Sequence, residues 1–162
     1  MKKHLALALP FFAAACSTPA PQLPKIAAPV PVITPNDTEL LDWRDKPYTP
    51  GLWRYANRTA SFGPAGIAPL LTMQCDAARR LIVISVSGAT SSLTIRTSYA
   101  ERSWPAQIGT DGRSVVSFAP ADPALDQIAF SRGRFSISGP GLTEIDIPAW
   151  AEPARVVEDC RS

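Results

Sequence analysis

Histidine is almost absent from this chain of 162 residues, in which His4 is the only one. Imidazole is the base in Ser-His-Asp and Cys-His catalysis and the usual ligand of catalytic zinc. Lysine is scarce too, and a serine–lysine dyad would have to use Lys46, because Lys25 lies in a proline-rich segment. Walker-type and GxGxxG phosphate-binding motifs are missing. These absences exclude the commonest hydrolytic, zinc and nucleotide chemistries, and we expect no cofactor.

Long hydrophobic runs are missing as well. Two lysines precede an apolar run from Leu5 to Ala15, which is shorter than the roughly 20 residues of a membrane-spanning helix. A short positive start, about 7–15 apolar residues and then small residues are typical of a secretory signal. The three alanines that end the run are followed by Cys16. This arrangement resembles the lipobox of bacterial lipoproteins, with Ala13 at the position where leucine is usual.

The lipobox resemblance implies a location. We predict that residues 1–15 are a lipoprotein signal peptide and that Cys16 is the lipid attachment site; ordinary signal cleavage, with Cys16 present by chance, is the alternative. Several acyl chains hold a protein stably on a membrane, whereas a single chain binds marginally. By analogy with bacterial lipoproteins, Ser17 after the cysteine favours the outer membrane. We therefore expect the protein at the inner leaflet of the outer membrane, with its domain in the periplasm.

Net charge gives no reason to expect a polyanionic partner. The chain has 16 basic and 14 acidic residues, and removal of Lys2 and Lys3 with the signal leaves 14 of each. A neutral chain has no global attraction for nucleic acid. The partners that we expect are the membrane, through the lipid, and an envelope protein or peptidoglycan; we expect no nucleic acid.

Proline divides the mature chain into two parts. Six prolines between residues 16 and 38 leave no helical or strand period, so this segment is predicted to be an extended tether. Residues 39–162 have the length of one domain. Apolar residues alternate with polar ones around 71–75 and 93–97, while 81–86 is mostly apolar, and both patterns predict strands.

Two segments of this domain have helical patterns. Asp122 and Pro123 are suited to the N-cap and the first position of a helix that ends at Gly133. A second helix is predicted to close the chain, with Trp150, Val157 and Cys160 on its buried side. We predict a mainly β domain, a β-sandwich or partly open barrel, with one short helix after the central strands and one at the C-terminus.

The two cysteines that remain after lipidation are Cys75 and Cys160. An exported chain enters an oxidising compartment, and an even number of thiols favours pairing. Both residues are predicted to face the core, one from a strand and one from the closing helix. Two sulfurs are too few for a metal site, and a nucleophilic thiol would need an activating neighbour. We predict a Cys75–Cys160 disulfide.

Carboxylates and a set of basic and aromatic residues are the remaining candidates for function. A pair of carboxylates suffices for glycoside cleavage. The available acidic side chains are Glu101, Asp111, Asp126, Glu144 and Asp146, of which the last three are predicted to be solvated. Exposed arginine and tryptophan side chains are typical of binding surfaces. The candidate binding face consists of Arg79 and Arg80 at a hairpin tip, Arg132 and Arg134 beside a helix end, Trp43 and Trp104; Trp53 and Trp150 are predicted to be core residues.

The sequences "SRGRF" at 131–135 and "WAEPARVVEDC" at 150–160 are the most distinctive pieces of the domain. On these pieces and the lipobox, the chain resembles a group of small envelope lipoproteins of alphaproteobacteria, for which no activity is established. A more distant resemblance, at the level of the fold, is to invasion-associated-protein-B-like and type VI secretion-associated envelope proteins. Function does not follow from fold.

The function that we predict is that of a lipid-anchored envelope protein with a non-catalytic binding or structural domain. One alternative is a lysozyme-inhibitor-like protein, with residues 85–92, "SVSGATSS", as the inhibitory loop. The other is a carboxylate-dependent glycosidase acting on peptidoglycan.

Overall fold

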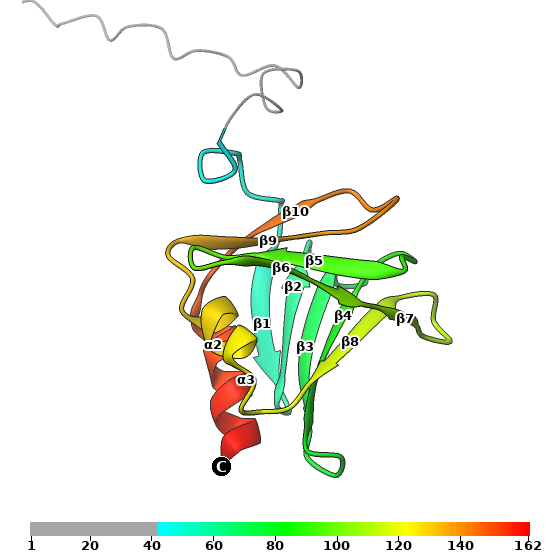
Figure 1. Ribbon diagram of the computed structural model, residues 1–162, viewed down its shortest axis with the longest axis vertical. Helices are drawn as coiled ribbons and strands as arrows, with labels where there is room; N and C mark the ends of the chain where they lie inside the picture. Colours follow the sequence, from blue (N-terminus) through cyan, green and yellow to red (C-terminus); the bar gives the residue numbers. More distant parts are fainter. Residues whose placement is uncertain (1–41) are drawn as a thin grey trace, which may run out of the picture. The chain divides into compact units, whose positions relative to one another are not determined.

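The computed structural model describes residues 42–162. The predicted signal peptide, Cys16 and the predicted tether lie outside these residues. The prediction of a mainly β domain with two short helices is confirmed (Figure 1). The strands form two separate antiparallel sheets, which do not close into a barrel.

The larger sheet has six strands and the smaller sheet has four. The strands of the larger sheet, in spatial order, are β1 (Leu52–Ala56), β2 (Thr59–Gly63), β3 (Leu71–Asp76), β4 (Leu81–Val86), β8 (Ser114–Phe118) and β7 (Gln107–Ile108). Those of the smaller sheet are β10 (Ile145–Pro148), β9 (Arg134–Ser138), β5 (Ser92–Arg96) and β6 (Glu101–Pro105). The strands of the smaller sheet run across one end of the larger sheet at a steep angle (Figure 1).

The core lies between the two sheets and follows the alternation in the sequence. On β3, Leu71, Met73 and Cys75 are buried, whereas Gln74 between them is exposed. Successive side chains of a strand point to opposite faces, so one face of β3 supplies the core. The smaller sheet contributes its own inward row of buried apolar side chains, which are Leu93, Ile95, Phe135, Ile137, Ile145 and Ile147.

Two strands, β6 and β7, are not predicted by the sequence. No residue of either strand is buried, and only Trp104 of β6 is partly covered. Both strands lie at sheet edges, where one side of the strand faces solvent and a regular apolar period is not required.

The first helix, α2 (Pro123–Ala129), begins as predicted. The side chain of Asp122 accepts a hydrogen bond from the backbone N–H of Ala124, and Pro123 occupies the first turn. The helix ends with Phe130 as its C-cap, before the predicted Gly133. Gly133 instead has a φ of 77° in the turn that leads into β9, a conformation that glycine adopts with little strain.

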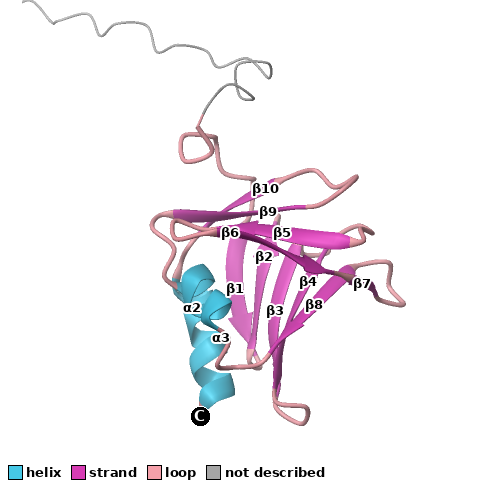
Figure 2. Ribbon diagram, viewed as in Figure 1, coloured by secondary structure: helices cyan, strands magenta, loops and turns pink. Residues whose placement is uncertain are grey.

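The second helix, α3 (Ala151–Arg161), lies beside α2 on one flank of the two sheets (Figure 2). Its buried residues are Pro153, Val156 and Val157. The prediction that Trp150 belongs to the core is wrong, because its residue surface is 49% exposed. Trp150 is the N-cap and has extended backbone angles, so the helical period used in the prediction does not apply to it. Neither helix within residues 42–162 combines the length and the apolar character that crossing a membrane requires.

Candidate functional site

The predicted disulfide is confirmed. Cys75 on β3 and Cys160 on α3 are bonded, and their Cα atoms are 5.4 Å apart, within the usual range for a disulfide. The bond fastens the last turn of the chain to the middle of the larger sheet. Trp53 supports the same flank from β1, since its indole N–H donates to the carbonyl of Pro148 at 2.8 Å, and its predicted place in the core is confirmed.

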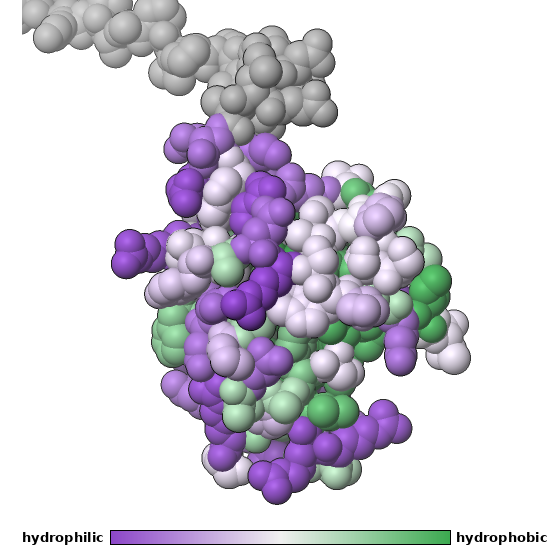
Figure 3. Space-filling model, in the orientation of Figure 1, coloured by the Kyte–Doolittle hydropathy of each residue, from purple (hydrophilic) through white to green (hydrophobic). Residues whose placement is uncertain are grey.

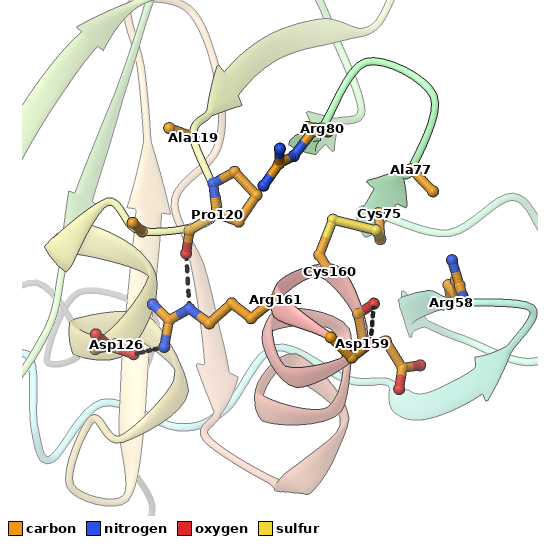
Figure 4. A pocket seen from close by; sticks show the side chains of 12 residues that line it. Arg58, Cys75, Ala77, Arg80, Ala119, Pro120, Asp126, Asp159, Cys160 and Arg161 are labelled. Carbon is orange, nitrogen blue, oxygen red and sulfur yellow. Dashed lines mark hydrogen bonds and ion pairs between the residues drawn. A yellow bond between two sulfur atoms is a disulfide. The ribbon is translucent and has the colours of Figure 1, made fainter.

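A cavity of about 670 Å³ opens beside this disulfide. Three arginines, Arg58, Arg80 and Arg161, line it together with Asp126 and Asp159 (Figure 4). The remaining lining is small and mostly apolar and consists of Ala77, Ala119, Pro120, Ala121, the two cysteines and Ser162. At this end of the domain, hydrophilic and apolar residues lie side by side on the surface (Figure 3). The cavity therefore combines positive side chains at its rim with a small apolar wall.

Arg161 is held inside the domain's own network. Its Nε donates to the carbonyl of Pro120 at 2.8 Å, and its Nη1 lies 2.8 Å from Asp126 Oδ1. The second acidic side chain of the cavity is also engaged, because Asp159 accepts a hydrogen bond from the Tyr55 hydroxyl. This bond, together with burial, raises the pKa of Tyr55. Both carboxylates of the cavity thus have partners within the domain.

Arg58 and Arg80 differ from Arg161. Within residues 42–162, neither side chain forms a hydrogen bond or an ion pair. Arg58 lies in the β1–β2 turn with a φ of 60°, and Arg80 lies in the β3–β4 turn with a φ of 54°. Left-handed backbone is unfavourable for residues with a Cβ atom, and arginine gains nothing locally to offset it. Two strained turns therefore present guanidinium groups to one cavity.

Of the two cavity arginines without partners among the described residues, only Arg80 is among the residues that the sequence predicts for a binding face. Arg79 and Arg80 do lie at a hairpin tip, but only Arg80 lines the cavity, whereas Arg79 faces Asp76 at 3.7 Å. Arg58 was not predicted. The signal for it is the sequence "Ala-Asn-Arg-Thr" between two alternating segments, where a two-residue turn normally carries Asn-Gly.

Arg134 is buried and is therefore not part of an exposed binding face. It is 9% exposed, and its guanidinium donates to the backbone carbonyls of Trp43, at 3.2 Å, and of Lys46. The same group lies 4.2 Å from the centre of the Tyr48 ring. Residues 42–49 fold over the start of β9 and supply the carbonyl acceptors of the Arg134 guanidinium. We call residues 42–49 the lead-in segment.

The other candidates for a binding face do not lie on one surface. Trp104 is directly opposite the buried Leu93 and packs edge-on against Phe118 of the larger sheet, with ring centres 5.2 Å apart. It therefore belongs to the inner side of the smaller sheet. Trp43 lies beside Arg96, 5.9 Å from ring centre to guanidinium, on the outer side. Arg132 is exposed, and its backbone N–H donates to Ser98 Oγ at 2.8 Å.

The outer side of the smaller sheet carries a charged cluster beneath the lead-in segment. Lys46 Nζ lies 3.0 Å from Glu144 Oε2, and Arg96 pairs with Glu101. Asp146, predicted to be solvated, is 7% exposed, and its backbone N–H donates to Thr49 Oγ1 at 2.9 Å. That prediction is wrong because the lead-in segment covers β10 and removes water from it.

The two acids of this cluster at the start of β10, Glu144 and Asp146, have pKa values that are shifted in opposite directions. Desolvation, and then the neighbouring charge of Glu144, raise the pKa of Asp146 above its ordinary 3.8. Desolvation would also raise the pKa of Glu144, but the hydrogen bond and charge of Lys46, with help from Ser136 and Arg96, lower it overall. Within the described residues, Asp146 Oδ1 has no hydrogen-bond partner. Its ionised form is therefore destabilised by folding.

We expect the Asp146→Asn variant to be more stable than wild type at pH 7, by about 1 kcal/mol, because an unpartnered buried charge is removed. A group whose pKa is raised by folding stabilises the fold below its unfolded pKa and loses that contribution as the pH rises through the folded pKa. The excess stability of the variant should therefore appear as the pH rises above about 4. Urea unfolding of both proteins between pH 3 and pH 8 measures it. Glu144 adds to the difference, because its charge repels Asp146 and its pKa falls further when that charge is removed. Equal stabilities of the two proteins at all pH values would contradict this account.

The proposed inhibitory loop of residues 85–92 is folded back onto β8. The N–H of Thr90 donates to Ser114 Oγ at 2.8 Å, and Ser114 Oγ donates to the carbonyl of Gly88 at the same distance. Thr90 itself is buried. These contacts hold the middle of the loop against β8 rather than leaving it extended from the domain.

The described part of the chain, residues 42–162, contains no group of three or more His, Cys, Asp or Glu side chains arranged to hold a metal ion. Compared with known proteins, the chain matches no family model, no curated protein and no solved structure. The resemblance to alphaproteobacterial envelope lipoproteins therefore stays a prediction, and the case for a function depends on the disulfide, the cavity and the N-terminal sequence.

Proposed function

We propose that the chain is a lipid-anchored protein of the bacterial cell envelope, whose domain of residues 39–162 binds a ligand or partner in the periplasm without catalysing a reaction. The observation that carries the proposal is the Cys75–Cys160 disulfide. Structural disulfides persist in oxidising compartments and are rare in the cytosol. The signal-like start and Cys16 supply the route to such a compartment and the attachment to its membrane.

The non-catalytic part of the proposal is supported by how the acidic side chains are used. Of the two acids in the cavity, Asp126 pairs with Arg161 and Asp159 binds Tyr55. Glu144 pairs with Lys46, and Asp146 is covered by the lead-in segment. Glycoside cleavage needs two carboxylates about 5–9 Å apart on either side of a bound sugar. Three of these acids are instead paired with side chains of the domain itself, and Asp146 is buried beneath the lead-in segment.

The anchoring is tested by the Cys16→Ala variant. We expect wild type to sediment with membranes and to start at an acylated Cys16 when its N-terminus is analysed by mass spectrometry. The variant should move almost completely to the soluble fraction, because without the lipid nothing else in the proposal holds it on the membrane. The Cys75→Ala/Cys160→Ala double variant is the matched control and should stay with the membrane. A wild-type chain that begins at another residue, or that carries no fatty acid, would refute the anchor.

A further inference from the structure

We propose that the cavity beside the disulfide binds the free carboxylate of a short, small-side-chain peptide, and that Arg58 and Arg80 hold that carboxylate. The inference deepens the proposed function, because peptides of this chemistry, rich in alanine and ending in carboxylates, occur in the cell wall that a periplasmic domain faces. It is carried by the placement of the two arginines, by the charges around the cavity and by the character of its walls.

The two arginines come from neighbouring hairpins that end at the same place. Arg58 follows β1 and Arg80 precedes β4, and their side chains lie on either side of the Cys75–Cys160 bond (Figure 4). The backbone of Arg58 is fixed, since its carbonyl accepts the N–H of Cys75 at 3.0 Å. A hairpin turn and a disulfide-bonded strand therefore position the cavity's rim before any ligand arrives. Such preorganisation reduces the entropy lost on binding.

The backbone conformation at these positions favours a smaller residue than arginine. Both arginines have left-handed φ angles, which glycine adopts readily and asparagine more readily than arginine. Strain of this kind is common at ligand-binding positions, where the side chain has a use that compensates for it. Among the described residues, three non-glycine residues have a positive φ, and two of them, Arg58 and Arg80, line the cavity; the third, Asn57, precedes Arg58 in its turn.

The arginines at the rim, rather than the net charge of the cavity, leave room for an anion. Three arginines line the cavity together with Asp126, Asp159 and the terminal residue Ser162. Arg161 is occupied by Asp126 and by the carbonyl of Pro120. The unpaired N–H groups belong to Arg58 and Arg80, and the planar guanidinium fork matches the two oxygens of a carboxylate.

The walls of the cavity favour a small organic acid over a bare ion. Three alanines, Pro120 and the disulfide form its apolar side. Its volume of about 670 Å³ is typical of a site for a small organic ligand and exceeds what a hydrated inorganic anion needs. Methyl-sized side chains of a ligand fit against the alanines of this wall. Within the described part of the chain, the lining contains no aromatic ring on which a nucleobase or a sugar ring could stack.

The test uses the full-length chain, purified in a non-ionic detergent and titrated in a calorimeter at low salt. The probes are an N-acetylated alanyl dipeptide with a free C-terminal carboxylate, the same dipeptide as its C-terminal amide, both in L and D forms, and inorganic phosphate. We expect at least one free-acid form to bind, the matching amide to bind at least tenfold more weakly, and phosphate to compete poorly.

The variants separate binding from folding. Arg58→Gly and Arg80→Gly should each weaken binding of the free acid at least tenfold, while leaving the melting temperature unchanged or raised, because glycine relieves the strained turns. Arg79→Gly, in the same turn as Arg80 but outside the cavity lining, is the matched control and should bind like wild type.

Three binding patterns would overturn the inference, and so would a complete lack of binding. They are equal binding of acid and amide, wild-type affinity in both cavity variants, and phosphate binding as tightly as the peptide, which would assign the site to an inorganic anion. The absence of binding by every probe up to millimolar concentration would also reject it. The anchor is tested separately by Cys16→Ala. If wild type is bound to the membrane but the titration fails, only the peptide site is refuted. If wild type is soluble but binds the peptide, only the anchor is refuted.

Discussion

Loss of the Cys75–Cys160 disulfide is expected to lower the free energy of unfolding by about 4–5 kcal/mol. The two cysteines are 85 residues apart, so the bond closes a loop that includes most of the domain. In the chain-entropy account, a cross-link restricts the unfolded chain, and its effect grows with the length of the loop. Domains of this size are stable by only about 5–15 kcal/mol, so reduction should remove a large part of the total.

Urea unfolding followed by tryptophan fluorescence measures this effect, with and without a thiol reductant and in the Cys75→Ala/Cys160→Ala double variant. The reductant should shift the midpoint of wild type and leave that of the double variant unchanged. The local consequence should be greatest in α3, because only Pro153, Val156 and Val157 then hold this helix by apolar burial. Hydrogen exchange in α3 should accelerate more than exchange in β5 or β9. An unchanged midpoint after complete reduction would show that packing alone holds the C-terminus.

The central strands could be predicted because each has one face in the core. Leu71, Met73 and Cys75 repeat at every second position, and the structure buries all three. The same argument located Leu93 and Ile95 on β5. Where an edge strand contributes little to the core, as in β6, the pattern disappears, and pairing with the neighbouring strand decides the conformation instead.

Helix predictions were accurate where a local contact determines the boundary and inaccurate where only the period was available. The Asp122 cap depends on a side chain bonding a backbone N–H two residues away, and sequence alone indicates it. The phase of α3 depends on where the helix begins. Trp150 proved to be its extended cap, so the buried face is built around Pro153 and Val156 rather than around the tryptophan.

The candidate site was predictable only in part, because its groups come together by tertiary structure. The cysteine pair followed from an even count of thiols and their predicted faces. Arg80 is predicted as a hairpin residue, but the cavity that it shares with Arg58 forms only because two hairpins end at the same side of the disulfide-bonded sheet. Arg113 illustrates the same limit, since its guanidinium donates to Ser85 and to the carbonyl of Pro69 at 2.8 Å, and both partners are distant in sequence.

The Arg134→Ala variant is expected to be destabilised by about 3 kcal/mol, because a hydrogen bond to a charged group contributes about 1.5–3 kcal/mol and Arg134 makes two. Its stacking on Tyr48 is lost as well. Lysine keeps the charge but not the fork, so Arg134→Lys should recover only part of the loss. Arg132→Ala, two residues away and exposed, is the matched control and should unfold like wild type. Thermal or urea unfolding distinguishes the three variants.

The same variant shows whether Arg134 holds the lead-in segment on the domain, through the titration of Asp146. If the segment detaches, water reaches Asp146 and its pKa falls back toward the ordinary value, since desolvation is the main cause of the shift. If the segment stays attached, the loss of a nearby positive charge raises the pKa of Asp146 further, because Arg134 lowers it in wild type. We expect the fall, measured by NMR titration of the carboxyl carbon. A rise would mean that Lys46 and Thr49 suffice to hold the segment, and that Arg134 contributes stability without positioning it.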